Sequence, residues 1–178
     1  MSLNRTCLTS MALTAVLMSG SLLLSGCGDS VSAETAAVRR QFLTESAPSG
    51  EVSIAEIRQK LKSGELKSDA TFVVRARINA GDMPPWGTGT ASFIVTDATG
   101  HDGDEEHDPH TCPFCSRNIQ DSLAQVHFVD ESGSLLPVDS RELFDLQEKL
   151  LVVVRGTGRI SESDDMLVIT AQQMFVKR

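Results

Sequence analysis

The chain has 178 residues, with 16 Lys and Arg against 24 Asp and Glu, so its formal net charge is -8. This length fits one ordinary domain with an extension and argues against two full domains. Hydrophobic residues make up 40% and charged residues 22%, which is the composition of a folded globular protein. The acidic balance argues against a protein that binds nucleic acid through a basic face.

The first 27 residues have the order of an export signal, in which a basic residue precedes an apolar stretch and then small residues. Arg5 is the only charged side chain before Asp29, and an apolar run over residues 11–24 follows it. The run leads into Leu24-Ser25-Gly26-Cys27, which resembles the lipobox of bacterial lipoproteins. In that family the cysteine is acylated and becomes the first residue of the mature chain, so the resemblance implies that Cys27 carries lipid.

The lipoprotein resemblance implies that residues 1–26 are a signal peptide and that the mature protein is anchored to a membrane of the cell envelope, facing the periplasm or the exterior. The alternative is an uncleaved transmembrane anchor, because the uncharged run from Thr6 to Gly28 is long enough to span a bilayer. Both interpretations place the rest of the chain outside the cytoplasm. The expected partners are the membrane itself, through the lipid, and an envelope ligand or protein that the sequence does not name; nucleic acid is not expected.

A low-complexity segment follows the predicted lipidation site. Residues 27–50 are rich in Ser, Ala, Glu and Thr and end in Ala47-Pro48-Ser49-Gly50. Such a composition predicts a flexible tether that lets a lipid-anchored domain reach away from the membrane. The folded domain is therefore predicted to cover residues 51–178.

A capping box opens this domain, with Ser53 as the N-cap and Glu56 three residues later. Apolar residues then recur at helical spacing, at Ile54, Ile57 and Leu61. Glu56 and Lys60 stand four residues apart, which favours an ion pair on one face of a helix. The pattern predicts a short amphipathic helix that ends near Gly64.

After this helix the hydrophobic period changes to two, which predicts β-strands. Five strands are expected, over residues 72–78, 90–97, 123–130, 151–160 and 166–176. A second capping box, Asp139-Ser-Arg-Glu142, predicts a helix between the third and fourth strands with apolar positions at Leu143, Leu146 and Leu150. A long polar segment, residues 98–122, separates the second strand from the third and is called the insertion below.

Three strands, one helix and two more strands is the order of the OB-fold, a five-stranded Greek-key barrel. The chain resembles a family of small secreted bacterial OB-fold proteins in four segments, residues 71–78, 126–130, 136–141 and 152–158. The resemblance covers residues 70–176 and implies an all-β domain with short helices, one of which precedes the barrel. An SH3-like barrel and a small β-sandwich are the alternatives, because the strand count suits them as well.

All four histidines and both remaining cysteines fall within 27 residues, at His101, His107, His110, Cys112, Cys115 and His127. A Cys-x-x-Cys turn sets two thiolates on one side of a tight loop, and zinc takes four such ligands in a tetrahedron. The sequence therefore predicts a transition-metal site made by Cys112, Cys115, His110 and one of the other three histidines. Zinc is favoured because a closed site would order a polar insertion, and copper is the alternative since it also binds thiolates and imidazoles.

The predicted function is a non-catalytic binding module, because the chain has no Gly-rich phosphate loop and no Ser-His-Asp pattern. Two alternatives remain. Cys112-Pro-Phe-Cys115 resembles the active-site tetrapeptide of glutaredoxins, which implies thiol-disulfide chemistry, although no βαβ pattern surrounds it; an inert local disulfide is the simpler form of that pairing.

An OB-fold also binds oligosaccharides, nucleic acids or peptides, and Trp86 with Arg75 and Arg77 would then contact the ligand. Without a ligand role, Trp86 would close one end of the barrel. Arg75 and Arg77 would then be the solvated face of their strand.

Overall fold

The computed structural model describes residues 32–99, 109–113 and 115–178, and of Cys115 only the backbone. Residues Val31–Arg178 form one compact unit. The predicted signal peptide and Cys27 lie outside the described residues. Within the described part of the chain, no helix is long and apolar enough to cross a membrane.

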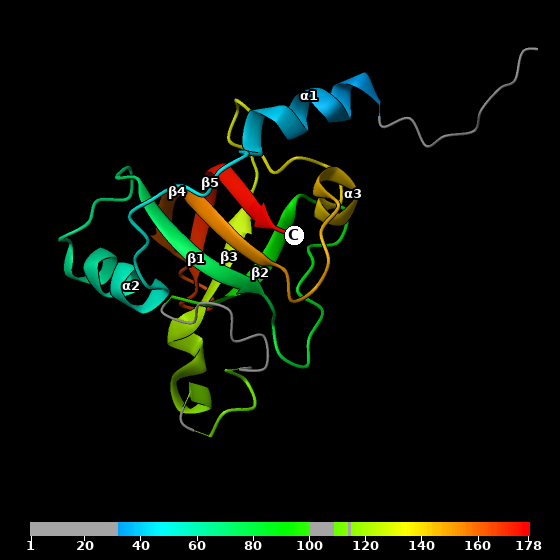
Figure 1. Ribbon diagram of the computed structural model, residues 1–178. Coiled ribbons are helices and arrows are strands. Elements are labelled where there is room, and N and C mark those ends of the chain that lie inside the picture. The colour runs from blue at the N-terminus through cyan, green and yellow to red at the C-terminus, as the bar shows by residue number, and fades with distance from the viewer. Residues whose placement is uncertain (1–31, 100–108, 114) are drawn as a thin grey trace, which may run out of the picture. The chain divides into compact units, whose positions relative to one another are not determined.

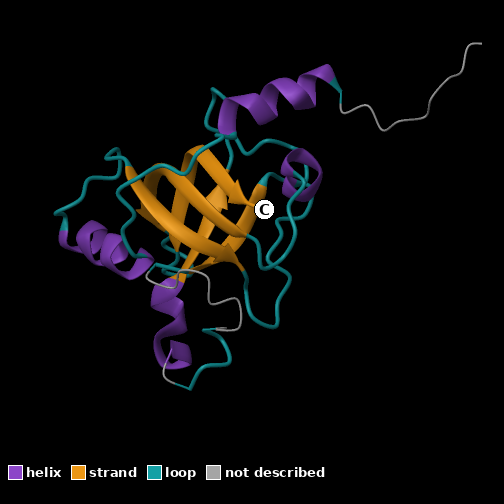
Figure 2. Ribbon diagram, viewed as in Figure 1, coloured by secondary structure: helices purple, strands orange, loops and turns teal. Residues whose placement is uncertain are grey.

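Five strands close into a barrel: β1 (Phe72–Ile78), β2 (Ser92–Asp97), β3 (Leu123–His127), β4 (Leu151–Ile160) and β5 (Leu167–Lys177). Around the barrel their order is β1-β2-β3-β5-β4, and β4 closes it by pairing with β1 (Figures 1 and 2). β3 and β5 pair in parallel, whereas the other four neighbouring pairs are antiparallel. This is an OB-fold-like barrel, as the sequence predicted.

The period-two pattern explains which side chains fill the barrel, because alternate residues of a strand point to opposite faces. The inward positions are fully buried, among them Val74, Ala76, Ile78, Phe93, Val95, Val126 and Ile169. Aromatic rings complete the core: the rings of Phe128 and Phe144 lie 4.5 Å apart, and those of Phe93 and Phe128 lie 6.0 Å apart. The apolar pattern of the five strands therefore supplies most of the core.

Helix α2 (Ile54–Ser63) forms where the sequence predicts it. The Ser53 hydroxyl accepts the backbone N–H of Glu56 at 3.2 Å, which satisfies one of the donors at the helix start. The predicted pair of Glu56 and Lys60 forms at 2.7 Å. Gly64, in the left-handed conformation with φ 75°, ends the helix.

Helix α1 (Ala33–Phe42) lies where the sequence predicts a flexible tether. Phe42 is only 4% exposed and belongs to the core, and the backbone N–H of Thr44 donates to the carbonyl of Met174 in β5. The tether prediction therefore fails for residues 33–44, which are part of the domain. The hydrophobic pattern does not predict that α1 docks on the domain, because Phe42 is the only buried residue of this helix and no apolar stripe marks it.

Helix α3 (Ser140–Phe144) begins at the predicted capping box but ends before Leu146 and Leu150, which the sequence pattern predicts to lie in the helix. Asp139 caps it by accepting the backbone N–H of Arg141 at 2.8 Å. The helix stops because Asp145 adopts a left-handed conformation, with φ 55°. This turn brings Leu146 into the core after Phe144, so burial of both residues outweighs continuation of the helix.

Candidate metal-binding loop

Both ends of the insertion are held against α2. At the start, the carboxylate of Asp97 accepts the backbone N–H of Ile54 through Oδ2 and that of Thr99 through Oδ1. At the end lies η1 (Cys115–Ser122), a 3-10 helix in which Asp121 accepts a hydrogen bond from Arg58 Nη2 at 3.5 Å. Helix α2 therefore fixes the two stems from which the insertion extends.

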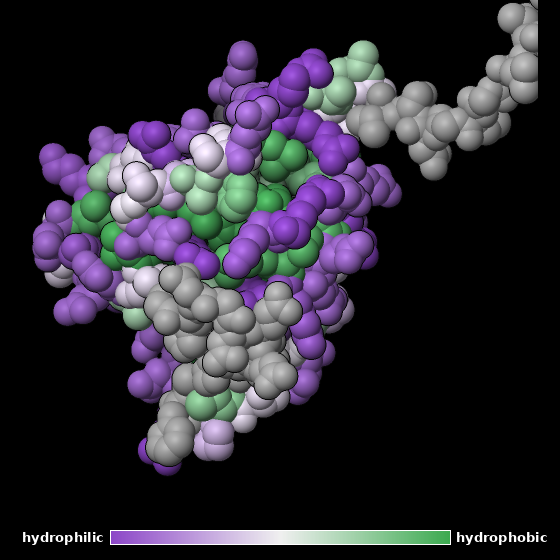
Figure 3. All heavy atoms as spheres, in the orientation of Figure 1, coloured by the Kyte–Doolittle hydropathy of each residue, from purple (hydrophilic) through white to green (hydrophobic). Residues whose placement is uncertain are grey.

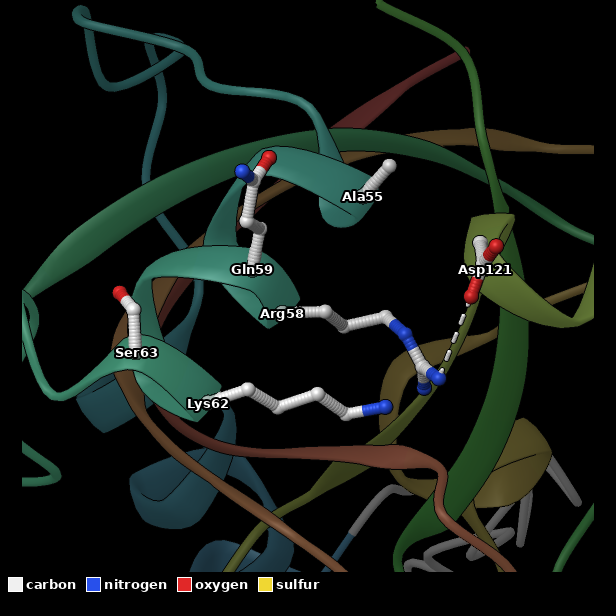
Figure 4. Close-up of a pocket in the computed structure, with 6 residues that line it drawn as sticks. All are labelled: Ala55, Arg58, Gln59, Lys62, Ser63 and Asp121. Carbon is white, nitrogen blue, oxygen red and sulfur yellow. Dashed lines mark hydrogen bonds and ion pairs between the residues drawn. The ribbon is translucent and has the colours of Figure 1, made fainter.

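Arg58 joins α2 to the turn between β4 and β5, and its side chain is almost fully buried. Its Nη1 donates to the carbonyl oxygen of Asp165 at 2.5 Å, and its Nη2 donates to the carboxylate of the same residue at 3.2 Å. Lys62 also reaches that carboxylate, at 2.7 Å. Figure 4 shows Arg58 and Lys62 extending from α2, with Arg58 reaching Asp121. The pairs with Lys62 and Arg58 lower the pKa of Asp165.

A surface groove of about 540 Å³ lies beside these contacts (Figure 4). It is lined by residues of α2 and by one residue of η1, namely Ala55, Arg58, Gln59, Lys62, Ser63 and Asp121. The two cations of this lining are already paired with carboxylates. The groove therefore has no excess charge that would select a charged ligand.

The imidazole of His110 is attached to the barrel at the end of β2. Its Nε2 lies 2.9 Å from the hydroxyl oxygen of Thr96, which is 1% exposed. The same hydroxyl donates to the carbonyl oxygen of Asn79 at 2.9 Å, just after β1. The ring also lies against Gly81, where an added Cβ would come within 2.7 Å of Nδ1. His110 therefore connects the insertion to the loop between β1 and β2.

The backbone turns between the two cysteines of the insertion. The N–H of Ser116 donates to the carbonyl oxygen of Cys112 at 2.9 Å, and Cys115 is the first residue of η1. Cys112 is partly exposed. The surrounding fold is a barrel, and η1 is a 3-10 helix interrupted at Asn118. This differs from the strand-to-α-helix setting that lowers a cysteine pKa in glutaredoxins.

Among the described residues, the structure does not bring His127 to the position of His110. Across the β2–β3 pair, Thr96 lies opposite Leu123 whereas His127 lies opposite Ser92. Ser92 and Thr96 are four positions apart, which corresponds to about 13 Å along a strand, so the register places His127 away from the end of β2 that holds His110. Its Nε2 is buried and has no hydrogen-bond partner among the described residues, and burial, followed by the charge of Arg159, lowers its pKa.

The two other histidines, His101 and His107, lie outside the described residues. In residues 32–99, 109–113 and 115–178, no three His, Cys, Asp or Glu side chains come together in a group that would hold a metal ion. Of the predicted ligands, the structure thus locates His110 and Cys112 with their side chains and Cys115 by its backbone. Thr96, Asn79 and Gly81, which hold His110, carry no signal in the sequence that marks them as part of a site.

Trp86 packs against the barrel core, as expected if it closes one end of the barrel. Its backbone bridges to Phe93, and the two rings are 6.2 Å apart. The guanidinium of Arg141 lies 5.6 Å from the centre of the Trp86 ring, which is a cation–π contact. Trp86 is therefore packed between the core and Arg141 and closes the barrel at this point.

Arg75 and Arg77 lie on the outer face of β1 and contact other parts of the domain. Arg75 is 3.6 Å from the carboxylate of Glu51, and Arg77 donates to the carbonyl of Lys149 at 3.0 Å. On the face shown in Figure 3, hydrophobic residues are visible between hydrophilic ones. Arg75 thus contacts Glu51 and Arg77 contacts Lys149, whereas Trp86 contacts Phe93 and Arg141, so these contacts do not join the three residues into one ligand site.

No protein-family model matches the chain, and no curated protein matches it. Among solved structures, an aspartyl-tRNA synthetase from Entamoeba histolytica is similar over 76% of this chain, with a TM-score of 0.41 and 10% sequence identity. This chain spans 25% of the length of that synthetase chain. The functional conclusion therefore rests on the residues of the candidate site.

Proposed function

We propose that this protein is an extracytoplasmic lipoprotein, anchored through Cys27, whose OB-like barrel carries a transition-metal site in the insertion. The proposal depends mainly on one observation: His110, two residues before the Cys-x-x-Cys turn, is held on the barrel by Thr96. Cys112, Cys115 and His110 are the proposed ligands, and His101 or His107 supplies the fourth. The module binds and does not catalyse.

The donor set suits zinc. Two thiolates and one imidazole are borderline-soft ligands of the kind that structural zinc sites use. One ligand is already fixed to the barrel, and the bond between Ser116 and Cys112 shapes the turn between the thiols. A bound metal would therefore join the insertion to the end of β2 and stabilise it. Copper remains the alternative, because it accepts the same donors.

The lipid anchor is supported by the order of the N-terminal residues and by the lipobox. Four residues separate Cys27 from Ser32, the N-cap of α1. A fully extended chain of this length spans about 17 Å. A lipid on Cys27 would therefore keep the domain close to the membrane surface, because only this short segment separates the lipid from the first helix.

The metal site is tested by purifying the full chain from membranes in detergent and reducing buffer, followed by elemental analysis and a thiol count. We expect about one zinc per chain, in line with a single structural site. Cys112→Ser and Cys115→Ser should lose the metal, whereas His127→Gln should keep it. A wild-type chain without metal contradicts the proposal, and copper in place of zinc selects the alternative metal. Metal-free chain with both thiols oxidised supports the redox interpretation instead.

The anchor is tested by growth with radiolabelled palmitate. The wild-type chain should take up label, and Cys27→Ala should not. Cys7→Ala is the matched control, because Cys7 lies within the predicted signal peptide and should leave labelling unchanged. Equal labelling of the wild-type chain and Cys27→Ala would contradict lipidation at this residue.

A further inference from the structure

The hydrogen bonds of Thr96 determine which nitrogen of His110 carries a proton. A threonine hydroxyl has a single proton to donate. In this barrel the proton is donated to the carbonyl oxygen of Asn79, at 2.9 Å. The 2.9 Å contact between the same oxygen and Nε2 of His110 is therefore one in which Nε2–H donates and the hydroxyl accepts. In the neutral imidazole the lone pair is then on Nδ1.

We propose that His110 binds the metal through Nδ1 and that Thr96 is the positioning residue that fixes this choice. The proposal rests on the proposed function, because it concerns the same site. A metal-ligating histidine commonly donates its other ring N–H to a nearby oxygen, which fixes the tautomer and the ring orientation. The Thr96 hydroxyl, itself fixed by Asn79, fills this role for His110.

The position of Gly81 agrees with ligation through Nδ1. A Cβ at Gly81 would lie 2.7 Å from Nδ1, 3.2 Å from Cε1 and 3.3 Å from Cγ. A point at the same distance from Nδ1, but in the plane of the ring on the axis of the Nδ1 lone pair, would lie farther from both Cε1 and Cγ. Gly81 therefore lies over the face of the ring, and its backbone supports the imidazole without standing on the axis of the lone pair.

The spacing of the ligands favours the same nitrogen. Nδ1 is the ring nitrogen closer to the histidine backbone, so a metal bound there lies nearer the main chain than one bound to Nε2. Only Thr111 stands between His110 and Cys112, which keeps both ligands close to the same stretch of backbone. Nε2 instead reaches Thr96 in the wall of the barrel, at a buried position.

The closing experiment uses the full chain with ¹⁵N-labelled histidine, loaded with ¹¹³Cd in place of zinc. We expect scalar coupling between cadmium and Nδ1 of His110, with Nε2 protonated, and His110→Gln assigns the signal by removing it. Coupling to Nε2 would overturn this proposal but leave the metal site intact. A cadmium signal with neither nitrogen nor thiolate ligands would overturn the proposed function as well.

Two variants of Thr96 test its role separately. Thr96→Ser keeps the hydroxyl and should bind cadmium with an affinity close to that of the wild-type chain. Thr96→Val keeps the shape of the side chain but removes the acceptor, so we expect about 10- to 100-fold weaker binding, the usual effect of losing such a partner. Equal affinities of the two variants would overturn the role of Thr96. The coupling measured in the wild-type chain does not depend on whether either variant folds.

Discussion

The ring of Phe42, in the last turn of α1, meets the ring of Phe128 edge to face, with centroids 5.1 Å apart and planes at 86°. Phe42 also contacts Phe144, at 6.2 Å. Edge-to-face contacts of this kind add to the gain from apolar burial. Phe42 is therefore the buried anchor of α1, and the partly buried Val38 and Leu43, together with the backbone bond from Thr44 to Met174, add to the attachment.

Replacing Phe42 tests this attachment. Phe42→Ala should lower the free energy of unfolding by about 3–5 kcal/mol, because it removes a buried ring from the core. Gln41→Ala is the matched control: Gln41 is exposed, so its loss should change stability by about 0.5 kcal/mol or less. Urea denaturation measures both values, and similar effects of the two changes would show that α1 does not dock through Phe42.

Two glycines of β4 face the barrel interior and differ in what surrounds them. A Cβ at Gly156 would lie 2.2 Å from the carbonyl oxygen of Thr170, whereas one at Gly158 would lie 2.7 Å from Cζ of Phe72. The first obstacle is backbone of the paired strand and the second is a side chain that can shift. Gly158→Ala should cost about 1–3 kcal/mol, the usual range for overpacking, and Gly156→Ala should cost more. Thermal unfolding measures the loss of stability in each variant. A smaller loss for Gly156→Ala than for Gly158→Ala would contradict the prediction.

His127 makes stability depend on pH in a defined direction. Its folded-state pKa lies below the ordinary value of 6.5, chiefly because of burial and then because of Arg159. Between these two pKa values the unfolded chain binds the proton and the folded chain does not, so stability rises with pH. The contribution is complete above pH 6.5 and is lost as the pH falls through the folded-state pKa.

His127→Gln should therefore reduce the loss of stability between pH 7.5 and pH 5. The measurement is denaturant unfolding at several pH values, with chelator present in every sample so that protonation of metal ligands does not contribute. An unchanged pH dependence in the variant would mean that His127 is not protonated on unfolding in this range.

Arg58 and Lys62 both pair with Asp165 but should differ in their contribution. Arg58 also donates to the carbonyl of Asp165 from a buried position, whereas Lys62 is exposed. Arg58→Met keeps the apolar stem and should cost about 1.5–3 kcal/mol, the range for hydrogen bonds to charged groups. Lys62→Met should cost less than about 1 kcal/mol, because exposed ion pairs contribute little. Comparable losses in urea unfolding would contradict the special role of Arg58.

The sequence predicts the barrel well because the hydrophobic pattern marks all five strands, and the inward positions of those strands fill the core. It also predicts α2, since Ser53 and Gly64 mark its two ends with local chemistry. These features depend on residues close together in the chain, where periodicity and capping are legible.

The features that the sequence does not reveal depend on distant partners. Helix α1 is anchored chiefly by Phe42, whose ring meets Phe128 and Phe144 far later in the chain. The contact between Thr96 and His110 joins a strand to a loop, and neither residue type marks it. The separation of His127 from His110 follows from strand register, which the clustering of histidines along the chain does not reveal.

The fixing of both stems of the insertion to α2 has a consequence for how such a protein can diversify. Asp97 is held by the first residue of α2, and Asp121 by Arg58 one turn later. Changes in the length or content of the intervening segment therefore need not disturb the register of β2 and β3. Selection, or a protein engineer, could alter the proposed metal site at this point while the barrel stays the same.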